Sequence, residues 1–530
     1  MSKSIANISV VALATLFSRF LGLGRDMLVS AVFGLGSLAS AFYTAFTLPN
    51  LFRRLLGEGA LTAALVPTLT EELRGGNRER AFALVNTVAS WLFVVTGTIV
   101  AGSMAAIALA TRAVPDGAGW GGDADRARRW LEAGDFAIIL FPYLLFVCLA
   151  AAFSAALQTL GRFLEPALSP IWLNVSMIVL LGGAAYNGWA GTDETRMLWL
   201  CGGALLGGFL QMTVPAAALA RQGWRPRFDL SVNDPLRQIV RLMVPTLFGS
   251  AIYLINMAVS RFIGLSLNDS AVAVLNLATR LMELPIGVFT IAVSTVIFPL
   301  IARHAAAGDL EQLATSYRKG MRLILVINVP AAVGLLVLAT PIIRLLFQRG
   351  EFNASDTLLM QPVLMACALG LPFISFVSIV LRAFYAQKDT KTPVRAALIS
   401  FLVNLALSLI LMGPLETLGL AIAGNVAVVV QAIYLQVHLA RKYPGLAFRY
   451  VRGDLVKVIA GALVMGALVA GGWELWRHYF PPAKVADAIA LVGLIGGGGL
   501  VYAGLVWIFR IEGRDELRVV VAKVAARAGF

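Results

Sequence analysis

The sequence predicts an all-α polytopic membrane protein with about 14 transmembrane helices. Three observations predict this fold class. Hydrophobic residues make up 59% of the 530 residues and charged residues only 14%, and the mean hydropathy is +0.82. Apolar runs of about 20 residues recur along the chain, and each is long enough to cross a hydrocarbon core about 30 Å thick. Basic residues concentrate in alternate loops, as they do in cytoplasmic loops. This composition leaves no soluble domain of useful size.

The expected spans follow one another through short loops. They lie near residues 5–33, 40–70, 80–110, 133–159, 166–187, 196–220, 236–264, 271–302, 314–339, 356–386, 393–413, 415–440, 454–477 and 486–509. One set of alternate loops is rich in Lys and Arg, whereas the opposite set is short, uncharged or acidic. An even number of spans then places both termini in the cytoplasm. The net charge of +14 is therefore assigned to membrane topology and not to nucleic-acid binding.

The first span carries charged residues inside an apolar run. Ser18, Gly22 and Arg25 are spaced i, i+4, i+7 and share one helix face, with Arg19 about a third of a turn away. Asp26 follows Arg25 directly. An arginine at mid-membrane costs roughly 2.5–3.5 kcal/mol on insertion scales, so several together are expected to face a polar cavity.

The second span repeats this combination after a proline. Pro49 lacks an N–H and is expected to break the helix, which is tolerated where the helix lines a cavity. Asn50 and Arg53 are three residues apart and lie on one face, and Arg54 can pair with Glu58 at i+4.

The eighth span has the same elements. Arg280 and Glu283 share a face, and Pro285 breaks the helix two residues later. Arginine binds phosphate through two parallel hydrogen bonds, so a converging cluster of these side chains is suited to a phosphate group. The predicted members of the cluster are Arg19, Arg25, Arg53 and Arg280. The alternative is that these arginines reach toward the interface or form structural ion pairs between helices.

Signatures of enzymes are missing, so no enzymatic activity, metal or cofactor is expected. The pair Asp123 and Asp125 lies in an expected outer loop at about 111–132 beside several arginines, and we interpret it as solvated loop. The three histidines lie at separate helix ends, and there is no P-loop and no GxSxG motif. The C-terminal half has no cluster of membrane-buried acids, so no cation site is expected there.

Four segments resemble a known family. The segments SRFLGLGRD (18–26), LPNLFRRLLGEGALTAALVP (48–67), ATRLMELPIGVF (278–289) and FYAQKDTKTPVR (384–395) are similar to the MurJ (MviN) family of lipid II flippases. That family belongs to the multidrug/oligosaccharidyl-lipid/polysaccharide exporter superfamily. The resemblance implies two six-helix lobes in a V around a central cationic cavity, with the last two helices forming a groove for a lipid tail. The corresponding domains are residues 1–225, 226–445 and 446–530, the last with a basic cytoplasmic tail.

The resemblance also implies a function and roles for the residues. It implies that undecaprenyl-diphosphate disaccharide-pentapeptide (lipid II) is flipped from the inner to the outer leaflet of the bacterial cytoplasmic membrane by alternating access, for peptidoglycan synthesis and cell shape. Lipid II, membrane lipids and wall-synthesis enzymes are the expected partners. The expected substrate-binding residues are Ser18, Arg19, Arg25, Asn50, Arg53 and Arg280. The expected gating or ion-pair residues are Asp26, Arg54, Glu58 and Glu283, and the expected helix breaks are Pro49 and Pro285. Many relatives carry Asp where this chain has Ser40 and Thr279.

Several alternative functions follow from the same residues. A drug or cation exporter of this superfamily would need buried acids in the cavity, where this chain has arginines; an exporter of another polyprenyl-linked saccharide is a further alternative. A membrane-embedded polyprenyl-phosphate transferase would need catalytic carboxylates or a metal motif. A scaffold for wall-synthesis enzymes would leave the buried arginines unexplained.

Overall fold

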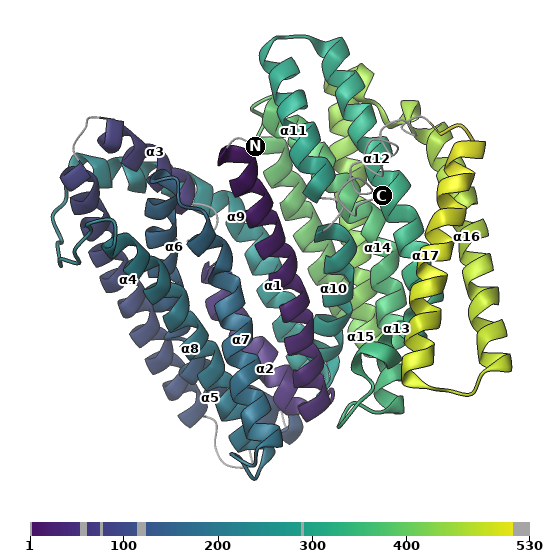
Figure 1. Ribbon diagram of the computed structural model, residues 1–530, viewed down its shortest axis with the longest axis horizontal. Helices are drawn as coiled ribbons and strands as arrows, with labels where there is room; N and C mark the ends of the chain where they lie inside the picture. Colours follow the sequence, from purple (N-terminus) through teal and green to yellow (C-terminus); the bar gives the residue numbers. More distant parts are fainter. Residues whose placement is uncertain (1–2, 54–60, 75–77, 114–122, 288–290, 512–530) are drawn as a thin grey trace. The chain divides into compact units, whose positions relative to one another are not determined.

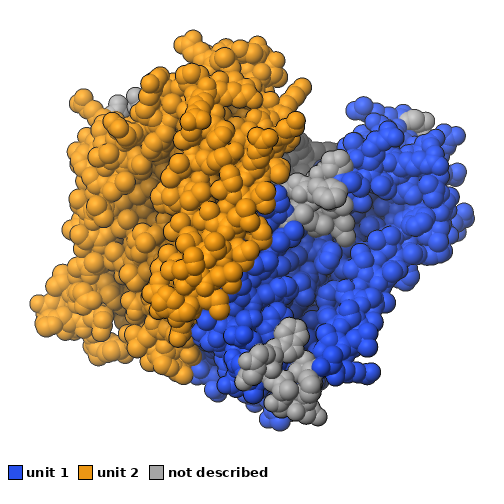
Figure 2. Space-filling model, turned by 180° about the vertical axis from the view of Figure 1, so that it is seen from behind, with its two compact units in different colours: residues 1–273, 349–352 blue, residues 274–348, 353–530 orange. Residues whose placement is uncertain are grey.

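The computed structural model describes residues 3–53, 61–74, 78–113, 123–287 and 291–511. Every regular element in these ranges is a helix, which confirms the predicted all-α class. The chain divides into two compact units (Figure 2). Unit 1 comprises Met1–Ala273 with Arg349–Phe352, and unit 2 comprises Val274–Gln348 with Asn353–Phe530.

Long apolar helices dominate both units. Within the described residues, eight helices are long and apolar enough to cross a membrane, and the bent pair α5–α6 adds a ninth. The chain is therefore a multi-pass membrane protein, whereas the predicted total of about 14 spans stays a prediction.

Unit 1 contains the helices from α1 to α9, labelled in Figure 1. Their bounds are α1 (Lys3–Phe33), α2 (Ser37–Phe52), α3 (Leu61–Arg74), α4 (Arg78–Arg112), α5 (Ala124–Leu140), α6 (Tyr143–Thr159), α7 (Leu164–Tyr186), α8 (Asp193–Ala220) and α9 (Asp234–Leu267). The predicted second span corresponds to α2 and α3, and residues 54–60 between them lie outside the described part of the chain.

Glycines bring α7 and α8 into close contact. A β-carbon on Gly203 would lie 2.8 Å from the Cα of Met177, and one on Gly207 would lie 2.6 Å from the Cα of Leu173. Two small residues four positions apart are the pattern that lets membrane helices approach to backbone contact. This packing fixes α7, and α7 in turn contacts α1.

The prediction of an outer loop at about 111–132 is wrong from residue 124 onward, because α5 begins at Ala124. Asp123 caps this helix by accepting a hydrogen bond from the backbone N–H of Arg126 at 3.0 Å, and such capping favours helix initiation. The predicted start of the fourth span at residue 133 therefore lies inside a helix. That span is also bent by 42° between α5 and α6, at Pro142.

Unit 2 contains most of α10 and all later helices. Their bounds are α10 (Ala271–Pro285), α11 (Ile291–Ala306), α12 (Leu310–Val337), α13 (Ala339–Phe347), α14 (Ala354–Ala386), α15 (Lys391–Lys442), α16 (Arg452–Tyr479) and α17 (Lys484–Ile508), with 3₁₀ turns η4 (Pro444–Leu446) and η5 (Phe448–Tyr450). The short helix α13 was not predicted.

The element α15 consists of two helices joined by a tight turn. Glu416 has non-helical backbone angles (φ 47°, ψ −129°) just after Pro414. Gly419 packs directly against the backbone carbonyl of Leu411. A β-carbon at this position would lie 2.4 Å from that oxygen, so the close approach requires glycine. The turn falls where the sequence places the boundary between the spans 393–413 and 415–440.

The core of unit 2 is built around α12, which packs against α11, α14 and α16. Tyr317 is 1% exposed, and its hydroxyl donates to Gln436 Oε1 at 2.9 Å. Arg318 donates to the Gly445 carbonyl at 2.7 Å and lies over the ring of Tyr450 at 3.9 Å. These contacts attach the 3₁₀ turns to the helical core.

Helix α9 packs on α2, α3 and α5 within unit 1. The sequence-based division into residues 1–225, 226–445 and 446–530 stays a prediction, as does the amphipathic tail, which falls beyond the last described residue, 511.

Candidate functional site

Arg25 and Asp26 form a buried ion pair on α1. Asp26 is 0% exposed and Arg25 is 8% exposed. The Nη2 and Nε atoms of Arg25 lie 2.7 and 3.0 Å from Asp26 Oδ1. Its Nη1 donates to Asn174 Oδ1 of α7 at 3.2 Å and lies 3.9 Å from the sulfur of Met177. A buried charge is tolerated when it is paired and hydrogen-bonded in this way.

Asn174 connects the two ends of the predicted helix face. Its Nδ2 donates to the Ser18 carbonyl at 3.2 Å and to the Pro170 carbonyl at 3.1 Å. Because Asn174 also accepts from Arg25, one amide joins both ends of the Ser18–Gly22–Arg25 face to α7. Gly22 is buried between them, and the side chains of Ser18 and Arg19 are half-buried.

Sequence reasoning missed Asn174. The available signal is a lone amide in the apolar segment PIWLNVSMIV, because a polar side chain inside a membrane span usually has a partner.

Asn50 and Arg53, which the sequence places on one face, are in contact at the end of α2. Arg53 Nε donates to Asn50 Oδ1 at 2.7 Å, and both residues are half-buried. Pro49 is buried and lies three residues before the end of α2, and Arg53 follows in a π-helical turn. The predicted partners Arg54 and Glu58 lie outside the described residues.

The corresponding pair in unit 2 is more open. Arg280 Nη1 lies 2.8 Å from Glu283 Oε2, and these side chains are 26% and 38% exposed. Pro285 is the last residue of α10 and is followed by a π-helical turn. Helices α2 and α10 thus each end within one turn of a proline, Pro49 or Pro285, and each carries a paired arginine.

The candidate binding residues are divided between the two units. Arg19, Arg25 and Arg53 belong to unit 1, and Arg280 belongs to unit 2. The convergence of all four on one cavity stays a prediction, and so do the individual binding and gating roles.

A second polar cluster in unit 1 was also missed, and it joins α5 to the turn between α9 and α10. Arg129 is 5% exposed; its Nη1 lies 3.0 Å from Asp269 Oδ1, and its Nε donates to the Leu265 carbonyl at 2.9 Å. Arg128 contacts Asp269 at 3.1 Å and Glu132 at 2.9 Å. The sequence signal for this cluster is the run Arg126, Arg128 and Arg129 in a segment where charged and apolar residues alternate.

Ser40 of α2 is hydrogen-bonded to the same turn. It is 0% exposed, donates to the Asp269 carbonyl at 2.6 Å and accepts from the Ala273 N–H at 3.2 Å. The hydroxyl is thus both donor and acceptor, which a carboxylate in its ionised form cannot be. Thr279, the other position where many relatives are expected to have Asp, is exposed, and its hydroxyl donates to the Leu275 carbonyl of its own helix at 2.6 Å.

No group of three or more His, Cys, Asp or Glu side chains in the described ranges is placed to hold a metal ion. Asp123 is a helix cap, and the hydrogen bond from the Arg126 N–H holds the pKa of its carboxyl below the ordinary value. The cysteines Cys148, Cys201 and Cys367 are free and buried. A pocket of about 280 Å³ in unit 1, between α2, α4, α5 and α9, has a mainly apolar lining that includes none of the predicted site residues.

Comparison with known proteins identifies similar chains. Residues 29–489 match the family model described as "Lipid II flippase MurJ". The chain is 33% identical over 534 residues to the probable lipid II flippase MurJ of Vibrio cholerae, covering 96% of each protein. A solved structure of "Lipid II flippase MurJ, inward closed conformation" is 25% identical, with a TM-score of 0.75, covering 96% of this chain and 99% of that one. An inward-facing MATE family transporter of the MOP superfamily, at 16% identity, shares the fold with a TM-score of 0.66, covering 83% of this chain and 98% of that one.

Proposed function

The chain belongs to the MurJ family, and we propose on this premise that it flips lipid II, the lipid-linked peptidoglycan precursor, from the inner to the outer leaflet. The observation that carries the proposal is the match to flippases of this name along almost the whole chain. Arg25, held by Asp26 and Asn174 inside a membrane protein, supports an arginine-based mechanism.

The charged diphosphate is the part of the substrate that cannot cross the membrane without the protein. Moving an unpaired ion into hydrocarbon costs many kcal/mol, so a path of guanidinium groups has to replace the lost hydration. Arginine offers a planar fork of donors that matches phosphate oxygens. In this proposal Ser18, Arg19, Arg25, Asn50, Arg53 and Arg280 bind the headgroup.

The carboxylates act as alternative partners for the arginines. Asp26 and Glu283 lie 2.7 and 2.8 Å from the guanidinium groups of Arg25 and Arg280 and neutralise them. In this proposal the substrate diphosphate competes with Glu283 for Arg280, and Arg54 and Glu58 form the equivalent pair of the second span. Rocking of two lobes then opens the cavity to the other side, while the prenyl tail stays in lipid beside the last two helices.

The proposed setting is the bacterial cytoplasmic membrane with both termini in the cytoplasm. The proposed partners are lipid II, the surrounding lipids and wall-synthesis enzymes. The proposed process is transport without covalent change of the substrate.

Depletion of the protein in its own host tests the function. Lipid-linked precursor should accumulate and stay unreachable to a reagent added outside the cell, and wild-type protein should restore access. Precursor that remains reachable at the normal rate would contradict the proposal. New covalent products in a purified system would instead support the transferase alternative.

A further inference from the structure

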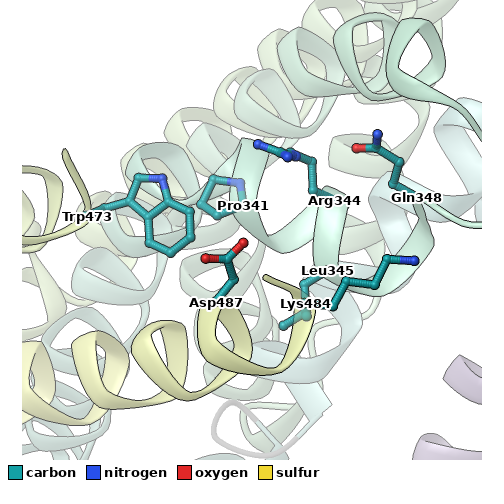
Figure 3. A pocket seen from close by; sticks show the side chains of 7 residues that line it. All are labelled: Pro341, Arg344, Leu345, Gln348, Trp473, Lys484 and Asp487. Carbon is teal, nitrogen blue, oxygen red and sulfur yellow. The ribbon is translucent and has the colours of Figure 1, made fainter. Parts of the chain in front are cut away.

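A small charged pocket lies at one end of the last two helices of unit 2, and its lining includes none of the predicted site residues. Its volume is about 110 Å³, well below the roughly 300–1,000 Å³ of sites for drug-sized ligands. It is lined by Pro341, Arg344, Leu345, Gln348, Trp473, Lys484 and Asp487. Figure 3 shows Arg344 and Gln348 on one side of the space and Asp487 on the other, with its carboxylate directed toward Trp473.

The pocket combines two cations, one anion and an indole. Arg344 and Lys484 are exposed, and neither lies within 4.0 Å of a carboxylate oxygen of the described residues. Asp487 Oδ1 accepts from Trp476 Nε1 at 3.0 Å, which fixes the carboxylate and leaves its second oxygen for another donor. Trp473 is 9% exposed and forms part of the wall.

The pocket lies where two apolar helices, each long enough to span a membrane, come to an end, and the end of such a span is where lipid tails meet headgroups. Helix α16 ends at Tyr479 and α17 begins at Lys484, so Trp473, Lys484 and Asp487 lie within two turns of this connection. The other lining residues come from α13 and its C-cap, Gln348. Trp476 and Phe480 stack beside it with ring centroids 4.1 Å apart, and aromatic residues concentrate at membrane interfaces. Further along α17, the side chains of Ile489 and Val492 are 68% and 70% exposed, as expected for a surface that contacts acyl chains.

We propose that this pocket binds the phosphoethanolamine headgroup of a membrane phospholipid. Arg344 and Lys484 contact the phosphate, while Asp487 accepts from the primary ammonium and the face of Trp473 lies against it. A site for a purely anionic headgroup would gain nothing from a carboxylate, because the two negative charges repel. The combination of both signs of charge in one pocket therefore favours a zwitterion. This inference is independent of the proposed flipping.

Lipid retention by the full chain tests the headgroup first. Delipidated protein is offered phosphatidylethanolamine, phosphatidylcholine or phosphatidylglycerol with identical acyl chains, and bound lipid is counted by native mass spectrometry. Phosphatidylethanolamine should bind about tenfold more tightly than phosphatidylcholine, whose ammonium has no N–H to donate. Equal retention of the three lipids by the wild-type protein would overturn the proposal without any variant.

Two variants and a control assign the residues. Asp487→Asn keeps an oxygen for Trp476 and removes the negative charge, so it should abolish the preference over phosphatidylcholine. Arg344→Gln should weaken the binding of both phosphatidylethanolamine and phosphatidylcholine about tenfold. Arg477→Gln is the matched control, because Arg477 is an exposed cation in the last turn of α16 that does not line the pocket. Loss of the preference in the control, or its retention in Asp487→Asn, would contradict the assignment.

A soluble competitor distinguishes a lipid from a free metabolite. Phosphoethanolamine without acyl chains should displace the lipid only weakly, because it lacks the contact with the apolar surface of α17. Displacement at concentrations equal to those of the lipid would reject the lipid as ligand.

Discussion

Arg25 in unit 1 and Arg280 in unit 2 each pair with a nearby carboxylate on the same helix, yet their surroundings differ. The side chains of Arg25 and Asp26 are 10% and 0% exposed, and Asn174 and Met177 of α7 complete the shell around Arg25. Arg280 and Glu283 are 26% and 38% exposed and lie one turn apart.

This difference separates structural from functional effects. Removing one partner of a buried ion pair destabilises a protein by about 3–5 kcal/mol, whereas exposed pairs contribute about 0.2–1 kcal/mol. Substitutions at Arg25 therefore change folding and transport together. Substitutions at Arg280 report on transport with little change in stability.

The largest effect is expected for Asp26→Ala. It leaves the buried guanidinium of Arg25 without its counter-charge and should lower the free energy of unfolding by about 3–5 kcal/mol. Thermal unfolding in detergent measures this. The double variant Arg25→Met with Asp26→Leu should recover most of the loss, because no buried charge remains. Wild-type stability of Asp26→Ala would refute the buried pair.

Asn174→Leu should lower the free energy of unfolding by about 1.5–3 kcal/mol, because it removes the acceptor of a hydrogen bond from the charged Arg25. It also removes the donor to the Ser18 carbonyl. The effect should be less than additive with that of Asp26→Ala, since both residues bind Arg25. Strict additivity in a double-mutant cycle would show that the two contacts are independent.

Ser40→Ala should lower the free energy of unfolding by about 1 kcal/mol, because it leaves the Ala273 N–H without its acceptor. Ser30→Ala is the control: Ser30 is equally buried, but its hydroxyl bonds only to the Met27 carbonyl of its own helix. Hydrogen exchange at Ala273 should accelerate in the Ser40 variant alone. Equal hydrogen-exchange rates at Ala273 in the two variants would show that the Ser40 hydroxyl does not protect the Ala273 N–H.

The smallest change in stability is expected for Arg280→Gln, at less than about 1 kcal/mol, because the pair is partly solvated. The unfolding temperature should stay close to that of the wild type. A loss as large as that of Asp26→Ala would show that the two regions do not differ as described.

Local patterns were sufficient to predict much of the molecule. Hydropathy predicted the helical membrane class, and three-residue spacing placed Asn50 with Arg53 and Arg280 with Glu283 on one helix face, where the structure has both pairs in contact. Asn174 and the Arg129–Asp269 pair could not be predicted in this way, since their partners lie 149 and 140 residues away in the chain. The helical start of α5 could not be predicted from the Asp123–Asp125 pair, because an aspartate that caps a helix and one in a solvated loop have the same local sequence.

The most direct test of the account is the flipping rate of the purified protein in vesicles. A lipid-linked diphosphate saccharide is placed in one leaflet, and its arrival in the other is followed with an impermeant reagent. We expect rapid arrival with the wild type, at least about tenfold slower arrival with Arg280→Gln, and an unchanged rate with the exposed control Arg477→Gln. A wild-type rate equal to that of empty vesicles, or an Arg280→Gln rate equal to the wild type, would contradict this expectation.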